Sequence, residues 1–451
     1  MAMAGSSLSI ARPHFARSQR ATFFALLVGY MGYYLCRQNF SAAFEPMKGA
    51  LGIDAETFGA ISSAGTLIYA FGKITTGSLA DARGGRAIFL IGLFGSVAAS
   101  CLFGVSSVVP LFFVAWGINR LFQSMGWGGL VTVLSRWYPK KQYGTAMGLM
   151  TISYQFGSVV ATLFAGWLLL MGAGWRGLFL WPALLLAAIG IGVHFFLADS
   201  PRDVGHQLPL DEEIVAPMII AGKTAEDEKA QAGPETFALA RFRILLTQPL
   251  FLIMCLLSAI LTFLRETFST WMPAYFFEMG ATGSVAAFKS AIFPLLGCLG
   301  TLAAGWLSDR YLKGSRVPVL TASLAALTLC LLGLQHLLPL SALLPFVGRD
   351  VLAVTLVGAT GFFLLAPYSM VGGGVVALDF GGRKMAGTAA GLLDGLGYAA
   401  AATAGWGVGR MVKVGGWSLA YSLMAWLGAG SVLLCVLLWG LARSRPQPVT
   451  G

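Results

Sequence analysis

The chain carries twelve apolar segments that are each long enough to cross a lipid bilayer, and this feature restricts its fold more than any other. A spanning helix needs about 20 mostly apolar residues. We therefore predict an all-α polytopic membrane protein with twelve transmembrane helices. The predicted spans cover residues 21–44, 56–80, 87–108, 110–136, 142–170, 175–197, 246–278, 283–308, 317–338, 349–378, 383–411 and 416–442.

The composition supports this fold class. Charged residues make up 11% of the chain, whereas a soluble domain has about 25%. The net charge of +11 does not indicate a nucleic-acid partner, because the basic residues form short clusters between apolar segments. Such clusters are typical of cytoplasmic loops. Most of the 30 Lys and Arg residues fall on one side if both termini are cytoplasmic, so we predict that orientation in the inner cell membrane.

A polar stretch divides the predicted helices into two groups of six. We predict a cytoplasmic N-terminus at 1–20, a first half at 21–198, a cytoplasmic linker at 199–243, a second half at 244–442 and a cytoplasmic tail at 443–451. The halves repeat: GSLADARGGR (77–86) corresponds to GWLSDRYLKGSR (305–316), and GTAMGL (144–149) corresponds to GTAAGL (387–392). Pseudo-symmetric halves with a substrate site between them are typical of secondary transporters.

The repeated glycine–aspartate–basic loops place charged side chains at the predicted cytoplasmic ends of both halves. We interpret these side chains as gating clusters that join the halves in one state and release them in the other. A role in membrane topology and helix capping is the alternative. The residues concerned are Asp81, Arg83, Arg86, Asp309, Arg310 and Arg316.

Arg37 and Arg265 both lie inside predicted spans, and the offset between them equals the offset between the repeated loops. They therefore occupy equivalent positions in the two halves. An uncompensated charge near a bilayer centre costs roughly 2.5 to more than 10 kcal/mol. A guanidinium offers a planar fork of donors that suits phosphate or carboxylate oxygens. We predict that the pair binds a small multiply charged anion, with phosphate as the best fit. Pairing of each arginine with a buried acid or helix carbonyl is the alternative.

Four motifs resemble helices of one known family. The repeated loops resemble the signature loop of the major facilitator superfamily. GYYLCRQNFSAAFEPM (32–47), FQSMGW (122–127), LRETFSTWMPAYF (264–276) and MAGTAAGLLDGLGY (385–398) are similar to the first, fourth, seventh and eleventh helices of its organophosphate:phosphate antiporters. The resemblance implies that Arg37 and Arg265 bind the phosphoryl group of the substrate.

The resemblance also implies which residues line the substrate pocket. It marks Tyr34, Trp127 and Tyr398, and Tyr30 shares a helical face with Arg37. Tyr154, where the glycerol-phosphate branch has a histidine, and the adjacent Gln155 are further candidates. The chain departs from the family elsewhere too: Gln38 replaces a frequent lysine, and Gly128 and Gly129 replace two prolines. Pro294 stands where the glycerol-phosphate branch has a glutamate. The substrate therefore stays open.

Glu266 and Asp394 are carboxylates set well inside predicted spans. Intramembrane carboxylates are candidates for proton relays or for partners of basic groups. We consider both as candidates for ion coupling, with static pairing inside the bundle as the alternative. Glu266 lies about 100° round the helix from Arg265, so it need not share the pocket of that arginine.

These features predict a transporter and not an enzyme. We expect rocker-switch exchange of an organophosphate for inorganic phosphate by a monomer in the lipid bilayer. No nucleotide-binding loop or metal-ligand spacing occurs in the sequence, so no cofactor, metal or catalytic residue is expected. An organic anion:proton symporter of the same superfamily and a sugar-phosphate sensor are the alternatives.

Overall fold

The computed structural model describes residues 5–138, 140–205, 245–311, 317–372 and 375–443, and these residues form helices joined by short connections, without a strand among them. The predicted all-α class is confirmed. Much of the predicted linker and the predicted tail lie outside the described residues, so the division into five segments stays a prediction.

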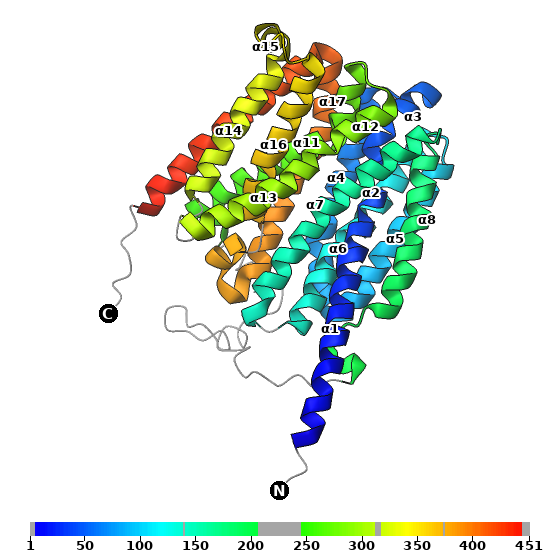
Figure 1. Ribbon diagram of the computed structural model, residues 1–451, viewed down its shortest axis with the longest axis vertical. Helices are drawn as coiled ribbons and strands as arrows, with labels where there is room; N and C mark the ends of the chain where they lie inside the picture. Colours follow the sequence, from blue (N-terminus) through cyan, green and yellow to red (C-terminus); the bar gives the residue numbers. More distant parts are fainter. Residues whose placement is uncertain (1–4, 139, 206–244, 312–316, 373–374, 444–451) are drawn as a thin grey trace.

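The helices fall into two groups along the chain, which lie side by side in Figure 1. The first group comprises α1 (Gly5–Tyr33), α2 (Leu35–Ala42), α3 (Phe44–Leu51), α4 (Ala55–Arg83), α5 (Gly85–Val105), α6 (Val109–Trp137), α7 (Lys140–Leu170), α8 (Gly177–Phe196) and the short η1 (Pro201–Val204). The second comprises α11 (Pro249–Glu278), α12 (Gly283–Ser290), α13 (Ile292–Tyr311), α14 (Val317–Gln335), α15 (Leu337–Leu343), α16 (Arg349–Gly372) and α17 (Val375–Arg443).

Each predicted span falls on one of these helices or on a consecutive pair, except that the last two spans share α17. A helix of 69 residues would be about 100 Å long, far more than the roughly 30 Å of a bilayer core. Gly416 has a φ of +68°, a conformation that favours glycine, and it reverses the chain between the two spans. In Figure 1 the orange part of α17 rises and its red part runs back down.

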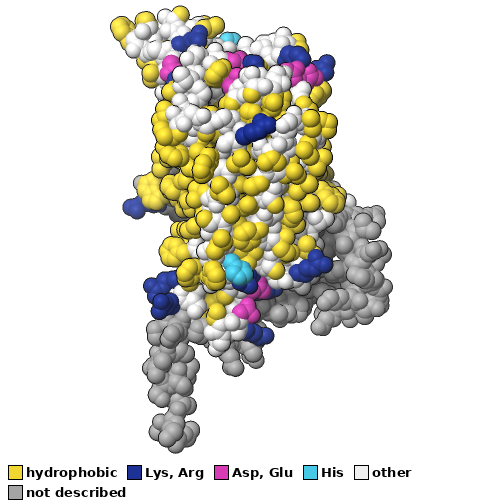
Figure 2. Space-filling view, turned by 90° about the vertical axis from the view of Figure 1, so that its right-hand side faces the viewer, with side chains coloured by type: hydrophobic (Ala, Val, Ile, Leu, Met, Phe, Trp, Pro, Cys, Tyr) yellow, Lys and Arg dark blue, Asp and Glu magenta, His cyan; other side chains and the backbone are white. Residues whose placement is uncertain are grey.

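Hydropathy differs among the helices. Eight described helical segments are long and apolar enough to cross a membrane on length and composition alone. The helices α1, α4 and α6 are not among them, and all three supply residues to the site described below. Figure 2 shows a broad hydrophobic band around the middle of the molecule, with most charged side chains near its two ends. This distribution matches a multi-pass membrane protein.

The two halves meet closely near the face that holds α3 and α15, here called the upper face (top of Figure 1). A Cβ atom added at Gly59 of α4 would lie 2.3 Å from the carbonyl oxygen of Gly405 in α17, and one at Gly405 would lie 2.4 Å from the oxygen of Gly59. The backbone amide of Trp406 donates to the Ser63 hydroxyl at 2.8 Å. Small residues at 59 and 405 therefore let the two helices touch backbone to backbone.

An ion-pair cluster joins the same two helices just above this contact. Lys413 Nζ lies 2.9 Å from an Asp54 carboxylate oxygen and 3.3 Å from one of Glu56, and Arg410 lies 3.8 Å from Glu56. Asp54 also caps α4 by accepting a hydrogen bond from the Thr57 amide at 2.9 Å. These contacts, here called the upper ion-pair cluster, hold the upper ends of the halves together.

The glycine contact predicts different effects for two alanine substitutions on the same helix. Gly405→Ala places a methyl group against the backbone of α4, so we expect a lower melting temperature in detergent. Gly407→Ala is the matched control, because a Cβ at that position meets nothing within 4 Å. Alanine favours a helix over glycine by roughly 0.5–1 kcal/mol, so the control should be neutral or slightly stabilising. Equal melting temperatures for the two variants would contradict the contact.

The upper ion-pair cluster predicts a defined pH dependence. Hydrogen bonds from Lys413 and from the Thr57 backbone lower the pKa of Asp54 from 3.8 to about 2. A carboxyl whose pKa is lowered by folding stabilises the protein above its unfolded pKa and loses that effect as pH falls toward its folded pKa. These ion pairs lie at the surface, where water and salt screen them, so we expect only a small contribution to stability.

The melting temperatures of the wild type and Asp54→Asn measure this contribution. Their difference should stay constant between pH 5 and 8 and shrink as pH falls from about 4 to about 2. A difference that changes between pH 5 and 8, or that persists unchanged at pH 2, would show that another group controls the cluster.

Candidate substrate-binding site

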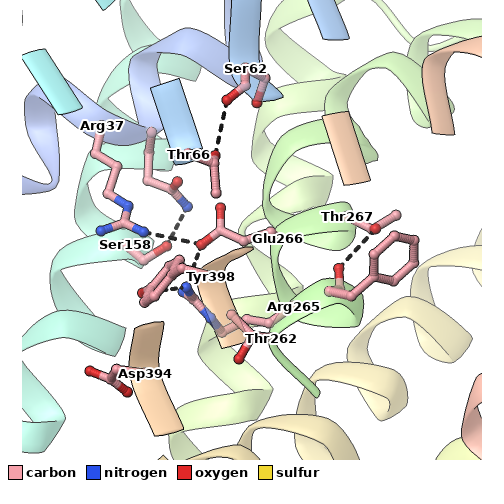
Figure 3. A network of polar contacts seen from close by, with 12 residues as sticks. Arg37, Ser62, Thr66, Ser158, Thr262, Arg265, Glu266, Thr267, Asp394 and Tyr398 are labelled. Carbon is pink, nitrogen blue, oxygen red and sulfur yellow. Dashed lines mark hydrogen bonds and ion pairs between the residues drawn. The ribbon is translucent and has the colours of Figure 1, made fainter. Parts of the chain in front are cut away.

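Two arginines from different halves converge on one buried carboxylate at the centre of the molecule (Figure 3). Arg37 on α2 donates through Nη2 to Glu266 Oε1 at 3.1 Å, and Arg265 on α11 donates through Nη2 to the same oxygen. Arg37 is 7% exposed and Arg265 is 6% exposed. The halves are thus connected through a charged contact that is shielded from solvent.

The expectation that Glu266 need not share the pocket of Arg265 is wrong. The two residues leave α11 in different directions, but both side chains are long enough for their charged ends to meet. The structure therefore brings Glu266 between Arg37 and Arg265, and each arginine has a buried acid as a partner. Because both use the same acid, the arginines lie together and not on separate sides of the bundle.

A break in the first spanning segment positions Arg37. Helix α1 ends at Tyr33 and α2 begins at Leu35, with Cys36 at φ −93° and ψ 18°, outside helical values. The amide of Arg37 donates to the carbonyl of Tyr34 at 3.1 Å, which closes a tight turn. Discontinuous helices beside the substrate are common in transporters, because the break frees polar groups near the membrane centre.

Tyrosine rings surround the charged groups. The guanidinium carbon of Arg37 lies 4.8 Å from the ring centroid of Tyr69 on α4, and that of Arg265 lies 4.7 Å from the centroid of Tyr368 on α16. Arg265 Nη2 also donates to the Tyr398 hydroxyl at 2.9 Å, and the Tyr398 ring contacts Tyr69 edge to face at 4.7 Å. Such cation–π contacts stabilise cations that have left water.

Two further cations, which the sequence analysis did not single out, also reach the site. Lys73 on α4 lies 3.4 Å from Asp394 on α17, a second ion pair between the halves. Arg120 on α6 stacks over Tyr69 at 4.6 Å. Lys73 and Arg120 each lie inside a predicted span, and this position could have marked them as candidates. Neither has an equivalent cation in the other half, so the repeat spacing did not point to them. In the described part of the chain, four cations face two carboxylates and leave two positive charges uncompensated: Arg37, Lys73, Arg120 and Arg265 against Glu266 and Asp394.

A cavity with about 530 Å³ of empty space lies on the Asp394 side of Arg265. It brings together most of the predicted substrate-binding residues. From the first half Trp127 contacts both Tyr30, at 5.4 Å between ring centroids, and Tyr154, at 6.4 Å. The cavity is lined by Tyr30, Tyr34, Trp127, Tyr154, Arg265, Asp394 and Tyr398 from the predicted set, together with Tyr69, Lys73, Thr151, Tyr368 and Ser369.

A smaller cavity continues from this site along the contact between the halves, and it contains residues where the chain departs from its family. Gln155 on α7 lines it and donates to the Thr301 hydroxyl on α13 at 2.9 Å. Gln38 donates to the Ser158 hydroxyl, and Pro294 forms part of the wall. A neutral amide and a proline thus stand at positions where the family often has charges.

The predicted gating residues are only partly described. Arg86 is bound within the first half, because its Nε donates to the Leu197 carbonyl at 2.7 Å and its Nη2 to the His194 carbonyl at 2.8 Å. Arg83 and Arg310 are exposed. The side chains of Asp81, Asp309 and Arg316 lie outside the described part. A gating role for these loops stays a prediction.

The shared carboxylate predicts a large effect of Glu266→Gln. Removing one partner of a buried ion pair leaves uncompensated charge and costs about 3–5 kcal/mol. We expect the melting temperature to fall, and added inorganic phosphate to raise it more in the variant than in the wild type, because an oxyanion replaces the lost charge. Asp350→Asn, which removes an exposed partner of Lys289, is the control. A variant as stable as the wild type would contradict a buried role for Glu266.

Comparisons with known proteins identify the family of the chain. A sequence model of the Major Facilitator Superfamily matches residues 26–405. A probable hexose phosphate transport protein of Chlamydia pneumoniae is 28% identical, over 94% of this chain and 92% of that protein. The glycerol-3-phosphate transporter of Bacillus subtilis is 26% identical, over 85% of this chain and 84% of that protein.

A solved structure shows the same fold. The crystal structure of a D-xylose–proton symporter superposes with a TM-score of 0.70 at 15% identity, covering 93% of this chain and 97% of that one. The predicted major facilitator fold is confirmed, and so is the predicted resemblance to organophosphate transport proteins. The chain belongs to the Major Facilitator Superfamily.

Proposed function

We propose that the protein is a secondary active transporter that exchanges an organophosphate for inorganic phosphate. The observation that carries this proposal is the convergence of Arg37 and Arg265, one from each half, on a single carboxylate oxygen. Two guanidinium forks around one oxygen atom form the geometry that binds an oxyanion. The carboxylate of Glu266 marks the place that substrate oxygens would contact.

The charge balance of the site supports an exchange mechanism. The described residues of the site retain two uncompensated positive charges, and closing the cavity around them removes water from those charges at a high cost. A phosphate group carries about 1.5–2 negative charges near pH 7, which nearly cancels them. The loaded carrier therefore closes at a lower cost than the empty one. A carrier that changes state only when loaded is an exchanger.

The contacts between the halves support a rocker-switch movement. The glycine contact and the upper ion-pair cluster join the halves on one side of the site, while the larger cavity lies on the other side of Arg265. Breaking the upper contacts and closing the cavity would expose the same arginines to the upper face. The basic clusters near the termini support a placement in the inner membrane with both termini in the cytoplasm.

Two relatives support the substrate class, since one is a probable hexose phosphate transport protein and the other is a glycerol-3-phosphate transporter. One chain supplies both arginines, so the site is complete in a monomer. Proton coupling has less support, because Glu266 pairs with two arginines and Asp394 pairs with Lys73. Both carboxylates thus have the contacts of static partners.

Purified protein in phosphate-loaded vesicles tests the proposal. We expect labelled phosphate to enter only when phosphate or an organophosphate is present inside. Arg37→Lys and Arg265→Lys should each reduce this exchange at least a hundredfold, because an ammonium group cannot replace the planar fork. Arg176→Lys, the same substitution at the upper end of α8, is the control and should exchange normally.

Three results would contradict the proposed exchange. Uptake that ignores the internal anion but follows a pH gradient would favour a proton symporter. Binding of phosphate without uptake would favour a sensor. Normal exchange by either site variant would show that the substrate binds elsewhere.

A further inference from the structure

We propose that Arg120 forms a second anion subsite, and that the preferred organophosphate therefore carries a carboxylate in addition to its phosphate. This inference rests on the proposed exchange function and names the substrate class of the same site. It comes from a buried cation, Arg120, that forms no ion pair among the described residues.

Arg120 is buried in the middle of α6 at 3% exposure. Its Nε atom has no hydrogen-bond partner, and no ion pair to Arg120 occurs among the described residues. Its guanidinium stacks over Tyr69 at 4.6 Å and lies 5.9 Å from the Trp116 ring centroid. Ring contacts stabilise a cation but leave its hydrogen-bond donors unused. A buried guanidinium with unused donors is costly, which favours a ligand that is not present in the empty protein.

A cavity adjoins Arg120 on the side of Glu266 that faces away from the larger cavity. It is lined by Arg120, Arg37 and Glu266 together with the hydroxyl-bearing Ser62, Thr66 and Thr270. Figure 3 places Ser62 and Thr66 on one side of Glu266 and Asp394 on the other. Arg120 lines the same cavity as Ser62 and Thr66, whereas Lys73 and Arg265 line the larger cavity together with Asp394.

This arrangement suits a short molecule with an anionic group at each end. The phosphate would bind between Arg37 and Arg265, and a carboxylate would accept from Arg120 and the nearby hydroxyl groups. A neutral hydroxymethyl end would leave Arg120 buried and unpaired, and sites built around polar partners discriminate strongly against such analogues.

The test compares 3-phosphoglycerate with glycerol-3-phosphate as competitors of labelled phosphate exchange in vesicles. The two molecules have the same chain length, and only one of them has a carboxylate in place of a hydroxymethyl group. We expect the wild type to require at least tenfold less 3-phosphoglycerate for half-inhibition. In Arg120→Gln this concentration ratio should approach one, because the group that recognises the carboxylate is lost.

Arg176→Gln removes an arginine charge outside the site and is the control, which should keep the wild-type ratio. If Arg120→Gln fails to insert into the membrane, Arg120→Lys replaces it. It keeps the charge but loses the fork, and the ratio should fall at least threefold.

The outcomes separate the two proposals. A wild type that exchanges phosphate but is inhibited equally by both competitors overturns the second subsite and leaves the exchange function intact. The subsite is also overturned if the ratio of the half-inhibiting concentrations is unchanged in whichever Arg120 variant is measured. A wild type that exchanges no phosphate under any condition contradicts the proposed function itself.

Discussion

The contact of Arg37 and Arg265 with one oxygen of Glu266 is the interaction on which the rest of the structure depends. The second half pairs Arg265 with its own Glu266, whereas among the described residues Arg37 of the first half has an ion pair only with Glu266 of the second half. Without that contact Arg37 would be buried at a large desolvation cost. The shared carboxylate lowers this cost while it holds the two halves together at the level of the site. A substrate oxyanion can replace part of this contact, so binding and the joining of the halves use the same donors.

Contacts between the halves along α4 and α17 set which side of the site is closed. Backbone approach at Gly59 and Gly405 and the pairs of Lys413 with Asp54 and Glu56 close the upper side. Lys73 and Asp394 form a second ion pair on the opposite side of the arginines. A rocking movement about the central site would exchange these contacts in turn.

Sequence patterns predicted the helical architecture of this molecule well, because the length of apolar segments and the spacing of repeated motifs can be read directly from the chain. The helices and the equivalence of Arg37 and Arg265 followed from such patterns. The position of Glu266 did not, since the direction in which a residue leaves a helix does not determine where a long side chain ends. Arg120 and Lys73 have no repeat partner, so spacing could not mark them. Arg120 contacts Tyr69, and Lys73 contacts Asp394. In each pair the two residues come from different helices, so the contact is not visible in the local sequence.

An arsenate-soaked crystal would test the shared oxyanion site most directly. Arsenate has the shape and charge of phosphate, and its arsenic atom gives an anomalous signal that locates the anion without reference to the protein. We predict a single arsenic peak with arsenate oxygens within hydrogen-bond distance of both Arg37 and Arg265, and a displaced Glu266 carboxylate. A peak that contacts only one of the two arginines, or that lies outside the contact between the halves, would contradict the central claim.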